Sequence, residues 1–250
     1  MTNKIAIFTS QTELTPTAKT LAHQLNLPII QTMNDTLPFI LLLDDKGLSL
    51  IQTEKHAPGP IRVDFVEGKL AHRRRNQQKE LLVKAAGITS VYKPTILDAT
   101  AGFGSDAFVL ATKGCQVIML ERSPIVAALL QDGLNRALEN HSLRDIISNM
   151  RLINIDSISY LKTLIENPDV IYLDPMFPLR KKSACVKKEM SALQKLLDPR
   201  DNIEELFQLA IQQAKKHVIV KRPKLAPSLT DRKPNFQLKG KSCRFDVYAS

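Results

Sequence analysis

The sequence predicts an α/β fold in which a mostly parallel sheet, closed by an antiparallel hairpin, follows a smaller α/β unit. Two patterns carry this prediction. From residue 94 onward, short β-type runs alternate with amphipathic helical segments, which is typical of parallel βαβ units. After the last helical segment, apolar and polar residues alternate from about residue 235 to the end, and this alternation predicts a terminal hairpin.

Residues 1–68 are predicted to form the small α/β unit. In order, we expect a strand over 4–8, a helix over 17–25, a hairpin of 39–43 and 48–52, and a strand over 61–66. The turn Asp44-Asp45-Lys46-Gly47 favours the hairpin, because Asp and Gly tolerate the backbone angles of tight turns. The second domain, 69–250, is expected to begin with a basic helix that ends near residue 86.

The second domain is predicted to hold five parallel strands. They are expected over 95–99, 116–121, 151–155, 170–174 and 217–220. One helix should start at Pro124, since Ser123 is a good N-cap and proline fits the first helical position. Further helices are expected after Asp156, with apolar residues up to Ile165, and over 203–214. Five parallel strands closed by an antiparallel pair form the layout of the Rossmann-like class I methyltransferases that use S-adenosylmethionine.

Composition and charge limit the classes of function. The 250 residues are 44% hydrophobic, which is enough for a core of this kind, and 35 Lys and Arg against 25 Asp and Glu give a net charge of +10. This excess favours a polyanionic partner, with nucleic acid first. Three cysteines without a CxxC pair, and no apolar run of about 20 residues, predict a reduced cytoplasmic protein that does not span a membrane. The five histidines show no HxxxH spacing, so no metal is expected.

A glycine loop follows the first strand of the second domain. Asp98 ends that strand, and Gly102 and Gly104 then let a ligand approach the main chain closely. The spacing also fits the dinucleotide fingerprint of a nicotinamide oxidoreductase, and Glu121 could accept ribose hydroxyls in either case. Asp98 favours S-adenosylmethionine, because its carboxylate attracts the cationic aminoacyl end of that cofactor and repels a pyrophosphate.

Other polar residues near the predicted strand ends have two possible roles. Asp156 could accept a hydrogen bond from the adenine amino group, and it is equally an N-cap of the following helix. Ser105 and Asp106 lie in the first turn of the helix after the glycine loop, where they serve as caps or as cofactor contacts.

The end of the fourth strand carries a second motif. Asp174-Pro175-Met176-Phe177 closely resembles the Asp/Asn-Pro-Pro-aromatic motif of methyltransferases that act on exocyclic amino groups. The side chain of Asp174 and the carbonyl of Pro175 could accept the two amine hydrogens, so that catalysis rests mainly on positioning. Phe177 could stack on the base, a contact worth about 1–3 kcal/mol. No cysteine follows a proline, which favours direct in-line transfer over a covalent thiolate route.

Positive charge gathers in three runs that hold no acidic residue, at 69–79, 180–188 and 215–224. The second run starts just after the amine motif and the third lies at the neighbouring strand, so both should border one crevice at the carboxyl ends of the strands. A solvated surface explains a single run, but two runs beside a base-binding motif favour a groove for RNA or DNA. The residues expected to contact nucleic acid are Arg73, Arg74, Arg180, Lys181, Lys182, Lys187, Lys188, Lys221 and Arg222.

From about Val63 to the C-terminus, the chain resembles the RsmJ family of bacterial small-subunit ribosomal RNA guanine-N2 methyltransferases. The matching blocks include 98–110, Tyr172-Leu-Asp-Pro-Met-Phe-Pro, Val220-Lys-Arg-Pro and Arg244-Phe-Asp-Val-Tyr. Met176 belongs to the family's own form of the amine motif. Residues 1–60 match weakly, so the resemblance assigns them no role.

The resemblance implies methyl transfer from S-adenosylmethionine to the N2 of one guanine near the 3′ end of 16S rRNA. Its implied partner is 16S rRNA or the small ribosomal subunit, and we expect a monomer without metal or membrane contact. The implied cofactor contacts are Ser105, Asp106, Glu121, Arg122, Asp156, Ser157 and Asp174. The alternative from another class is a non-catalytic RNA-binding ribosome-assembly factor, against which the intact Asp98, Glu121 and Asp174 argue.

Overall fold

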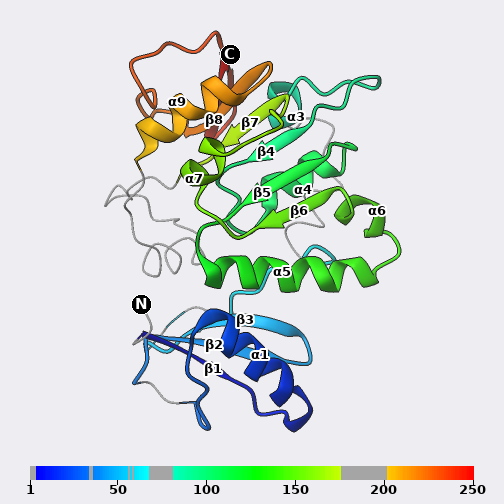
Figure 1. Ribbon diagram of the computed structural model, residues 1–250, viewed down its shortest axis with the longest axis vertical. Helices are drawn as coiled ribbons and strands as arrows, with labels where there is room; N and C mark the ends of the chain where they lie inside the picture. The colour runs from blue at the N-terminus through cyan, green and yellow to red at the C-terminus, as the bar shows by residue number, and fades with distance from the viewer. Residues whose placement is uncertain (1–3, 34–35, 56, 58, 68–80, 176–201) are drawn as a thin grey trace.

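The computed structural model describes residues 4–33, 36–55, 57, 59–67, 81–175 and 202–250 (Figure 1). Among these residues the chain forms a three-stranded sheet, in the order β1-β2-β3, and a seven-stranded sheet, in the order β6-β5-β4-β7-β8-β10-β9. Within the same residues, no helix is both long and apolar enough to cross a membrane.

The larger sheet has the predicted mixture of strand directions. Its strands are β4 (Ile96–Asp98), β5 (Val117–Leu120), β6 (Met150–Ile153), β7 (Val170–Leu173), β8 (His217–Pro223), β9 (Phe236–Lys239) and β10 (Cys243–Ala249). The first five pair in parallel, whereas β10 runs antiparallel to both β8 and β9. The predicted parallel sheet with its terminal antiparallel hairpin is therefore confirmed. The strand order reverses between β4 and β7, and such a switch point opens a crevice at the carboxyl ends of the strands.

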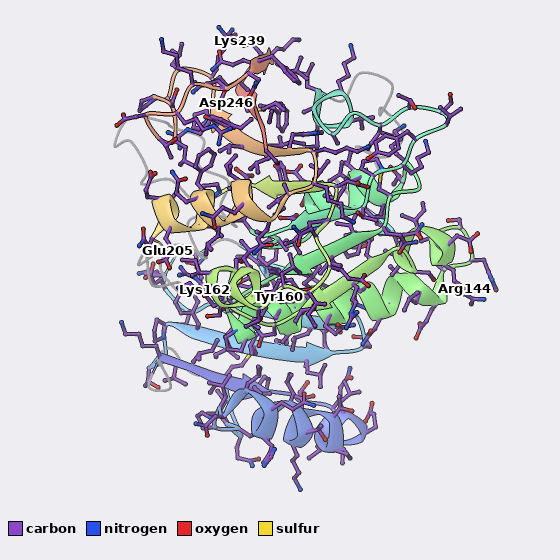
Figure 2. All side chains as sticks on the ribbon, turned by 45° about the horizontal axis from the view of Figure 1, so that its top comes forward. Arg144, Tyr160, Lys162, Glu205, Lys239 and Asp246 are labelled. Atoms are coloured by element: carbon purple, nitrogen blue, oxygen red, sulfur yellow. The ribbon has the colours of Figure 1, made fainter. Side chains whose placement is uncertain are left out.

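Helices cover both faces of the larger sheet. They are α3 (Leu81–Ala85), α4 (Ser105–Ala111), α5 (Pro124–Glu139), α6 (Arg144–Ile147), α7 (Ser157–Lys162) and α9 (Ile203–Gln213). Neighbouring strand residues point to opposite faces, so Ile96 joins the core cluster that includes α4 and α5, and Leu97 joins the cluster that includes α7 and α9. On the second face, Lys162 of α7 pairs with Glu205 of α9 at 2.6 Å (Figure 2).

The predicted helix starts have local causes that the structure confirms. Ser123 accepts a hydrogen bond from the backbone N–H of Val126, and Pro124 is the first residue of α5. The last predicted helical stripe forms α9. The helix after Asp156 is shorter than expected: Thr163 leaves the helical conformation after α7, its hydroxyl donates to the carbonyls of Ser159 and Tyr160, and Ile165 is 94% exposed.

The small unit contains β1 (Ile5–Phe8), a 3-10 turn (Thr12–Leu14), α1 (Thr15–Leu25), β2 (Phe39–Asp44) and β3 (Gly47–Gln52). Strands β2 and β3 form the predicted hairpin, in which Asp44 pairs with Gly47. Strand β1 pairs in parallel with β2, on the side away from β3. The strand, helix and hairpin expected here are all present, with ends shifted by one or two residues.

The strand predicted over 61–66 is wrong. Ile61 forms one isolated bridge with Leu50, and the chain then leaves the sheet because the side chain of Asp64 accepts the backbone N–H groups of Val66 and Glu67. The apolar residues of this segment, Val63 and Phe65, are buried nonetheless, at 3% and 1% exposure. Their alternation reflects burial against the larger domain, not sheet pairing.

The small unit and the larger domain share a hydrophobic core. The domain boundary between residues 68 and 69 stays a prediction. The small sheet lies against α5 (Figure 1), and one cluster of buried residues runs from β1 to β10. Gly133 of α5 faces Val63, whose carbonyl oxygen accepts from the Arg136 guanidinium at 2.5 Å. Phe65 contacts Phe108 of α4, with 5.0 Å between ring centroids.

Gly133→Ala is expected to destabilise the protein, although alanine usually stabilises a helix interior by about 1 kcal/mol relative to glycine. A Cβ at this position would lie 2.8 Å from Val63 Cγ1 and 2.9 Å from its carbonyl oxygen. The clash should lower the free energy of unfolding by about 1–3 kcal/mol, measured by urea denaturation. Gln131→Ala, at an exposed position of the same helix, is the control and should stay within about 0.5 kcal/mol of the original. Equal stability of the two variants would contradict close contact at Gly133.

Candidate functional site

Acidic side chains gather at the switch point of the larger sheet. Asp98 is the last residue of β4, Glu121 follows β5, and Asp174 follows β7. Because β5, β4 and β7 are consecutive neighbours in the sheet and run in parallel, their carboxyl ends lie at one edge. The structure thus brings together the three acids that the sequence singled out.

The glycine loop bends sharply between β4 and α4. Gly102 and Gly104 have φ angles of 54° and 70°, a left-handed conformation that glycine adopts without strain. A Cβ on Gly104 would lie 2.9 Å from Leu130 Cδ1, so this glycine allows the loop to rest on α5. At Gly102 nothing lies within 4 Å of the corresponding position. The loop is therefore supported on the Gly104 side and open at Gly102.

Glu121 holds the glycine loop from the neighbouring strand. One carboxylate oxygen accepts the backbone N–H of Gly102 at 3.1 Å, and the other accepts that of Ser123 at 2.7 Å. The side-chain amide of Asn154 donates to the Glu121 carbonyl at 2.6 Å. Glu121 is 7% exposed, so its two backbone contacts fix the loop against the end of β5.

A chain of hydrogen bonds joins α4, β7 and β8. The hydroxyl of Tyr172 donates to Asp106 Oδ2 at 2.6 Å, and the ammonium of Lys221 donates to the same oxygen at 2.8 Å. Lys221 also donates to Asp174 Oδ2 at 2.8 Å. The backbone N–H of Asp174 donates to Thr100 Oγ1 at 2.6 Å, which ties the start of the amine motif to the glycine loop.

The pKa values of this cluster follow from burial and charge. Burial raises the pKa of Tyr172, and the negative charges of Asp106 and Asp174 raise it further, so the hydroxyl keeps its proton. Burial alone would lower the pKa of Lys221, but the two carboxylates outweigh it and raise that pKa above its ordinary range. Lys221 is therefore a permanent ammonium between two acids.

Asp98, at the end of β4, has only 1% of its surface exposed. Burial raises the pKa of Asp98 to about 8; the backbone N–H of Thr100 lowers it, and the charges of Asp106 and Asp174 add to the rise. At neutral pH this carboxyl therefore holds a proton. A cation placed beside it would favour the ionised form, so the position fits a cationic ligand.

The structure also locates the other residues that the sequence predicted as cofactor contacts. Asp156 caps α7 by accepting the backbone N–H of Ser159, which confirms the N-cap interpretation and leaves an adenine contact as a prediction. Ser157 donates to the carbonyl of Ala99, just after β4. The N-cap of α4 is Gly104 and makes no side-chain cap bond, so the interpretation of Asp106 as a cap is replaced by its contacts with Tyr172 and Lys221.

Two of the predicted RNA contacts do not point outward. Lys221 reaches the carboxylates described above, and Arg222 is 5% exposed. The Arg222 guanidinium donates to the carbonyl of Pro227 at 2.8 Å, and Arg244 donates to the same carbonyl and to Asp246. Arg222 therefore stabilises the segment after β8 in place of the expected RNA contact.

Several predicted site residues lie outside the described residues. They are Met176, Phe177, Arg73, Arg74, Arg180, Lys181, Lys182, Lys187 and Lys188. Pro175 is described and buried, and Arg122 is half-buried.

Sequence reasoning missed Thr100, Tyr172 and the inward direction of Lys221. A signal for Tyr172 was available, because residues two apart in a strand point to the same face and Asp174 lies two positions later. For Lys221 the signal is the strand register, since β7 and β8 pair Leu173 with Val220 and the next positions are Asp174 and Lys221. That register is a property of the folded sheet.

Comparison with known proteins decides between the possible cofactors. Residues 20–250 match the family model described as "Putative SAM-dependent methyltransferase". Proteins named ribosomal RNA small subunit methyltransferase J are similar over nearly the whole chain: 45% identity in Cellvibrio japonicus, covering 94% of both chains, and 46% in Thioalkalivibrio sulfidiphilus, covering 99% of this chain and 98% of the relative. The chain belongs to the ribosomal RNA small subunit methyltransferase J family.

Membership of the methyltransferase J family confirms the resemblance to the RsmJ family and the use of S-adenosylmethionine. A solved SAM-dependent methyltransferase from Neisseria gonorrhoeae has the same fold, with 32% identity and a TM-score of 0.78 over 98% of this chain and 95% of that one. The nicotinamide alternative is thereby set aside. The buried carboxyl of Asp98 and the open space beside Gly102 fit a cofactor that carries positive charge.

Alanine at the two loop glycines is expected to have different effects. Both positions have positive φ, so alanine costs about 1 kcal/mol of strain at each. Gly104→Ala should lose about 1 kcal/mol more, because its Cβ meets Leu130, and thermal denaturation measures this. Gly102→Ala should stay folded but bind S-adenosylmethionine about tenfold more weakly in calorimetry, a change of about 1.4 kcal/mol. Unchanged cofactor affinity in Gly102→Ala would contradict an approach of the ligand from this side.

Asp98 should make the stability of the protein without cofactor depend on pH. The folded protein holds this proton up to about pH 8, whereas the unfolded chain releases it near the ordinary aspartate pKa of 3.8. The contribution of this carboxyl is therefore greatest below about pH 4 and declines as pH rises to about 8, by at most about 1.4 kcal/mol per pH unit.

Denaturant unfolding of the original protein and Asp98→Asn between pH 5 and 9 measures this effect. The original should lose stability relative to the variant as pH rises, until the difference levels off above about pH 8. A difference that does not vary with pH would mean that Asp98 is already ionised in the folded state.

Proposed function

We propose that the chain transfers a methyl group from S-adenosylmethionine to the exocyclic N2 amino group of a specific guanine in 16S rRNA. The substrate is the RNA itself or the small ribosomal subunit that contains it. The names of the relatives, ribosomal RNA small subunit methyltransferase J, support small-subunit rRNA as the substrate. The Asp174-Pro175 motif at the end of β7 supports an exocyclic amino group as the acceptor.

In this proposal the ends of β4 and β5 and the start of α7 hold the cofactor. Asp98 accepts from the cationic aminoacyl end, and Glu121, with Arg122 beside it, binds the ribose side. Gly102 and Gly104 allow the main chain to approach, and Ser105 and Asp106 follow them in α4. Asp156 and Ser157 border the adenine. S-adenosylmethionine, when bound, supplies a methyl group on a sulfonium and leaves as S-adenosylhomocysteine.

Asp174 and Pro175 hold the acceptor amine. The Asp174 carboxylate and the Pro175 carbonyl each accept a hydrogen bond from the amino group, which fixes the nitrogen, and Phe177 stacks on the base. As the bond from the nitrogen to the methyl group forms, the bond from that methyl group to sulfur breaks, and the nitrogen releases one proton to solvent. One observation carries the proposal: Asp174 is bonded to Thr100 of the glycine loop through its backbone and, through Lys221, to Asp106 of α4. The acceptor motif and the cofactor loop are therefore mechanically joined, as positioning of two reactants requires.

The distribution of charge supports an RNA partner for the larger domain. Residues 1–67 carry five Lys and Arg against seven Asp and Glu, although the whole chain has a net charge of +10. The excess of positive charge thus belongs to the larger domain. Among its described residues, Lys224, Lys239 and Lys241 are exposed near the carboxyl edge of the sheet, where Lys224 is bonded to the β9–β10 turn (Lys239 in Figure 2).

Asp174→Ala is expected to lower the rate of methyl transfer about 100-fold, because the amine loses one of its two acceptors and shifts out of line. The assay follows labelled methyl into 16S rRNA, or into small subunits from cells that lack the enzyme, and mass spectrometry maps the modified base. Asp174→Asn keeps an acceptor oxygen and is expected to retain part of the activity. A wild-type protein that binds S-adenosylmethionine but methylates no guanine N2 would refute the proposed function.

A further inference from the structure

We propose that Lys221 is a positioning residue of the amino-group site, and that its ammonium fixes the carboxylate of Asp174 against Asp106. This inference rests on the proposed function, since it takes Asp174 as the group that binds the acceptor amine. It gives Lys221 a role different from the RNA contact predicted from the sequence. Lys221 does not touch the reacting atoms in this scheme; it acts through Asp174.

The geometry of the bridge is specific. The Lys221 nitrogen lies 2.8 Å from Asp106 Oδ2 and 2.8 Å from Asp174 Oδ2, so one ammonium binds both carboxylates. Asp106 is held a second time by the Tyr172 hydroxyl at 2.6 Å. Lys221 follows Val220, which pairs with Leu173 of β7, so the sheet register sets it beside Asp174.

Burial and charge argue against a phosphate at this position. The Lys221 side chain is 26% exposed, and that of Asp106 is 9% exposed. A phosphate that approached this ammonium would have to displace a carboxylate and would meet the negative charges of Asp106 and Asp174. Like charges at such distances repel strongly in a partly buried site. RNA phosphates are therefore better bound by exposed lysines such as Lys224.

The bridge has a clear consequence for the amine. Without the ammonium, Asp106 and Asp174 would repel each other across the end of β7, and Asp174 would leave the position that it holds in the structure. A shifted Asp174 is a poorer acceptor for a hydrogen bond from the amino group. Lys221 thus keeps Asp174 in place and linked to the helix that follows the glycine loop.

Steady-state kinetics of Lys221→Met, Lys221→Arg and Lys224→Met on 16S rRNA test this role. Lys221→Met should lower kcat about 100-fold, as expected when a reacting group is misplaced, and change the KM for RNA less than about threefold. Lys221→Arg keeps the charge and should recover part of kcat. Lys224→Met, the exposed lysine after the same strand, is the matched comparison and should raise the KM for RNA instead.

Two further measurements separate positioning from general damage. Calorimetry should show that S-adenosylmethionine binds to Lys221→Met at least as tightly as to the original protein, since the variant removes a cation from a site for a cationic ligand. If Lys221→Met does not fold, the double variant Lys221→Met/Asp106→Asn, in which one negative charge is removed with the positive one, should fold and be slower than Asp106→Asn alone.

The outcomes distinguish this inference from the proposed function. An original protein without guanine methylation would overturn the proposed function and, with it, the role of Asp174 on which the inference rests. An active original protein together with a Lys221→Met variant of unchanged kcat and raised KM for RNA would overturn the inference alone. A loss of cofactor affinity equal to the loss of kcat would also overturn it, because the effect would then arise at the cofactor.

Discussion

The arrangement of the candidate site depends on one electrostatic constraint: several carboxyl groups lie close together, largely out of contact with water, at the carboxyl ends of the strands. Asp98, Asp106 and Asp174 lie close enough for each to influence the charges of the others, and like charges in such a place are unfavourable. The fold resolves this in two ways: Asp98 holds a proton at neutral pH, and the Lys221 ammonium lies between the other two. The site is thereby prepared for a ligand that brings positive charge, which matches the cofactor of the family.

The supports of this edge come from both parts of the chain. Glu121 fixes the glycine loop from β5, and Gly104 lets the loop rest on Leu130 of α5. A Cβ on Gly104 would also lie 3.5 Å from Phe65, which contacts Phe108 of α4. Because Phe65 belongs to the segment that follows the small sheet, that segment supports the glycine loop directly. The end of the small unit is thus part of the framework of this strand edge.

Basic residues that are neighbours in the sequence have different surroundings in the folded protein. Within the run 215–224, Lys221 binds two carboxylates, Arg222 is buried against the carbonyl of Pro227, and Lys224 is exposed. Three neighbouring cations therefore have three different surroundings. Alternation along β8 and the turn after Pro223 cause this difference, since successive side chains of a strand point to opposite faces. The number of cationic residues in such a run is accordingly an upper limit on the number that reach the surface of the folded protein.

The sequence by itself determined the features whose causes are local. The strand and helix order follows from apolar periodicity, the start of α5 from Ser123 and Pro124, and the glycine loop from residues that tolerate positive φ. The acids at the strand ends were also predictable, because carboxyl ends of parallel strands share an edge. Only the tertiary structure decided that Val63 and Phe65 are buried without strand pairing, and that Lys221 faces inward. Both depend on partners distant in sequence, namely α5 and α4 for the first and the register of β7 with β8 for the second.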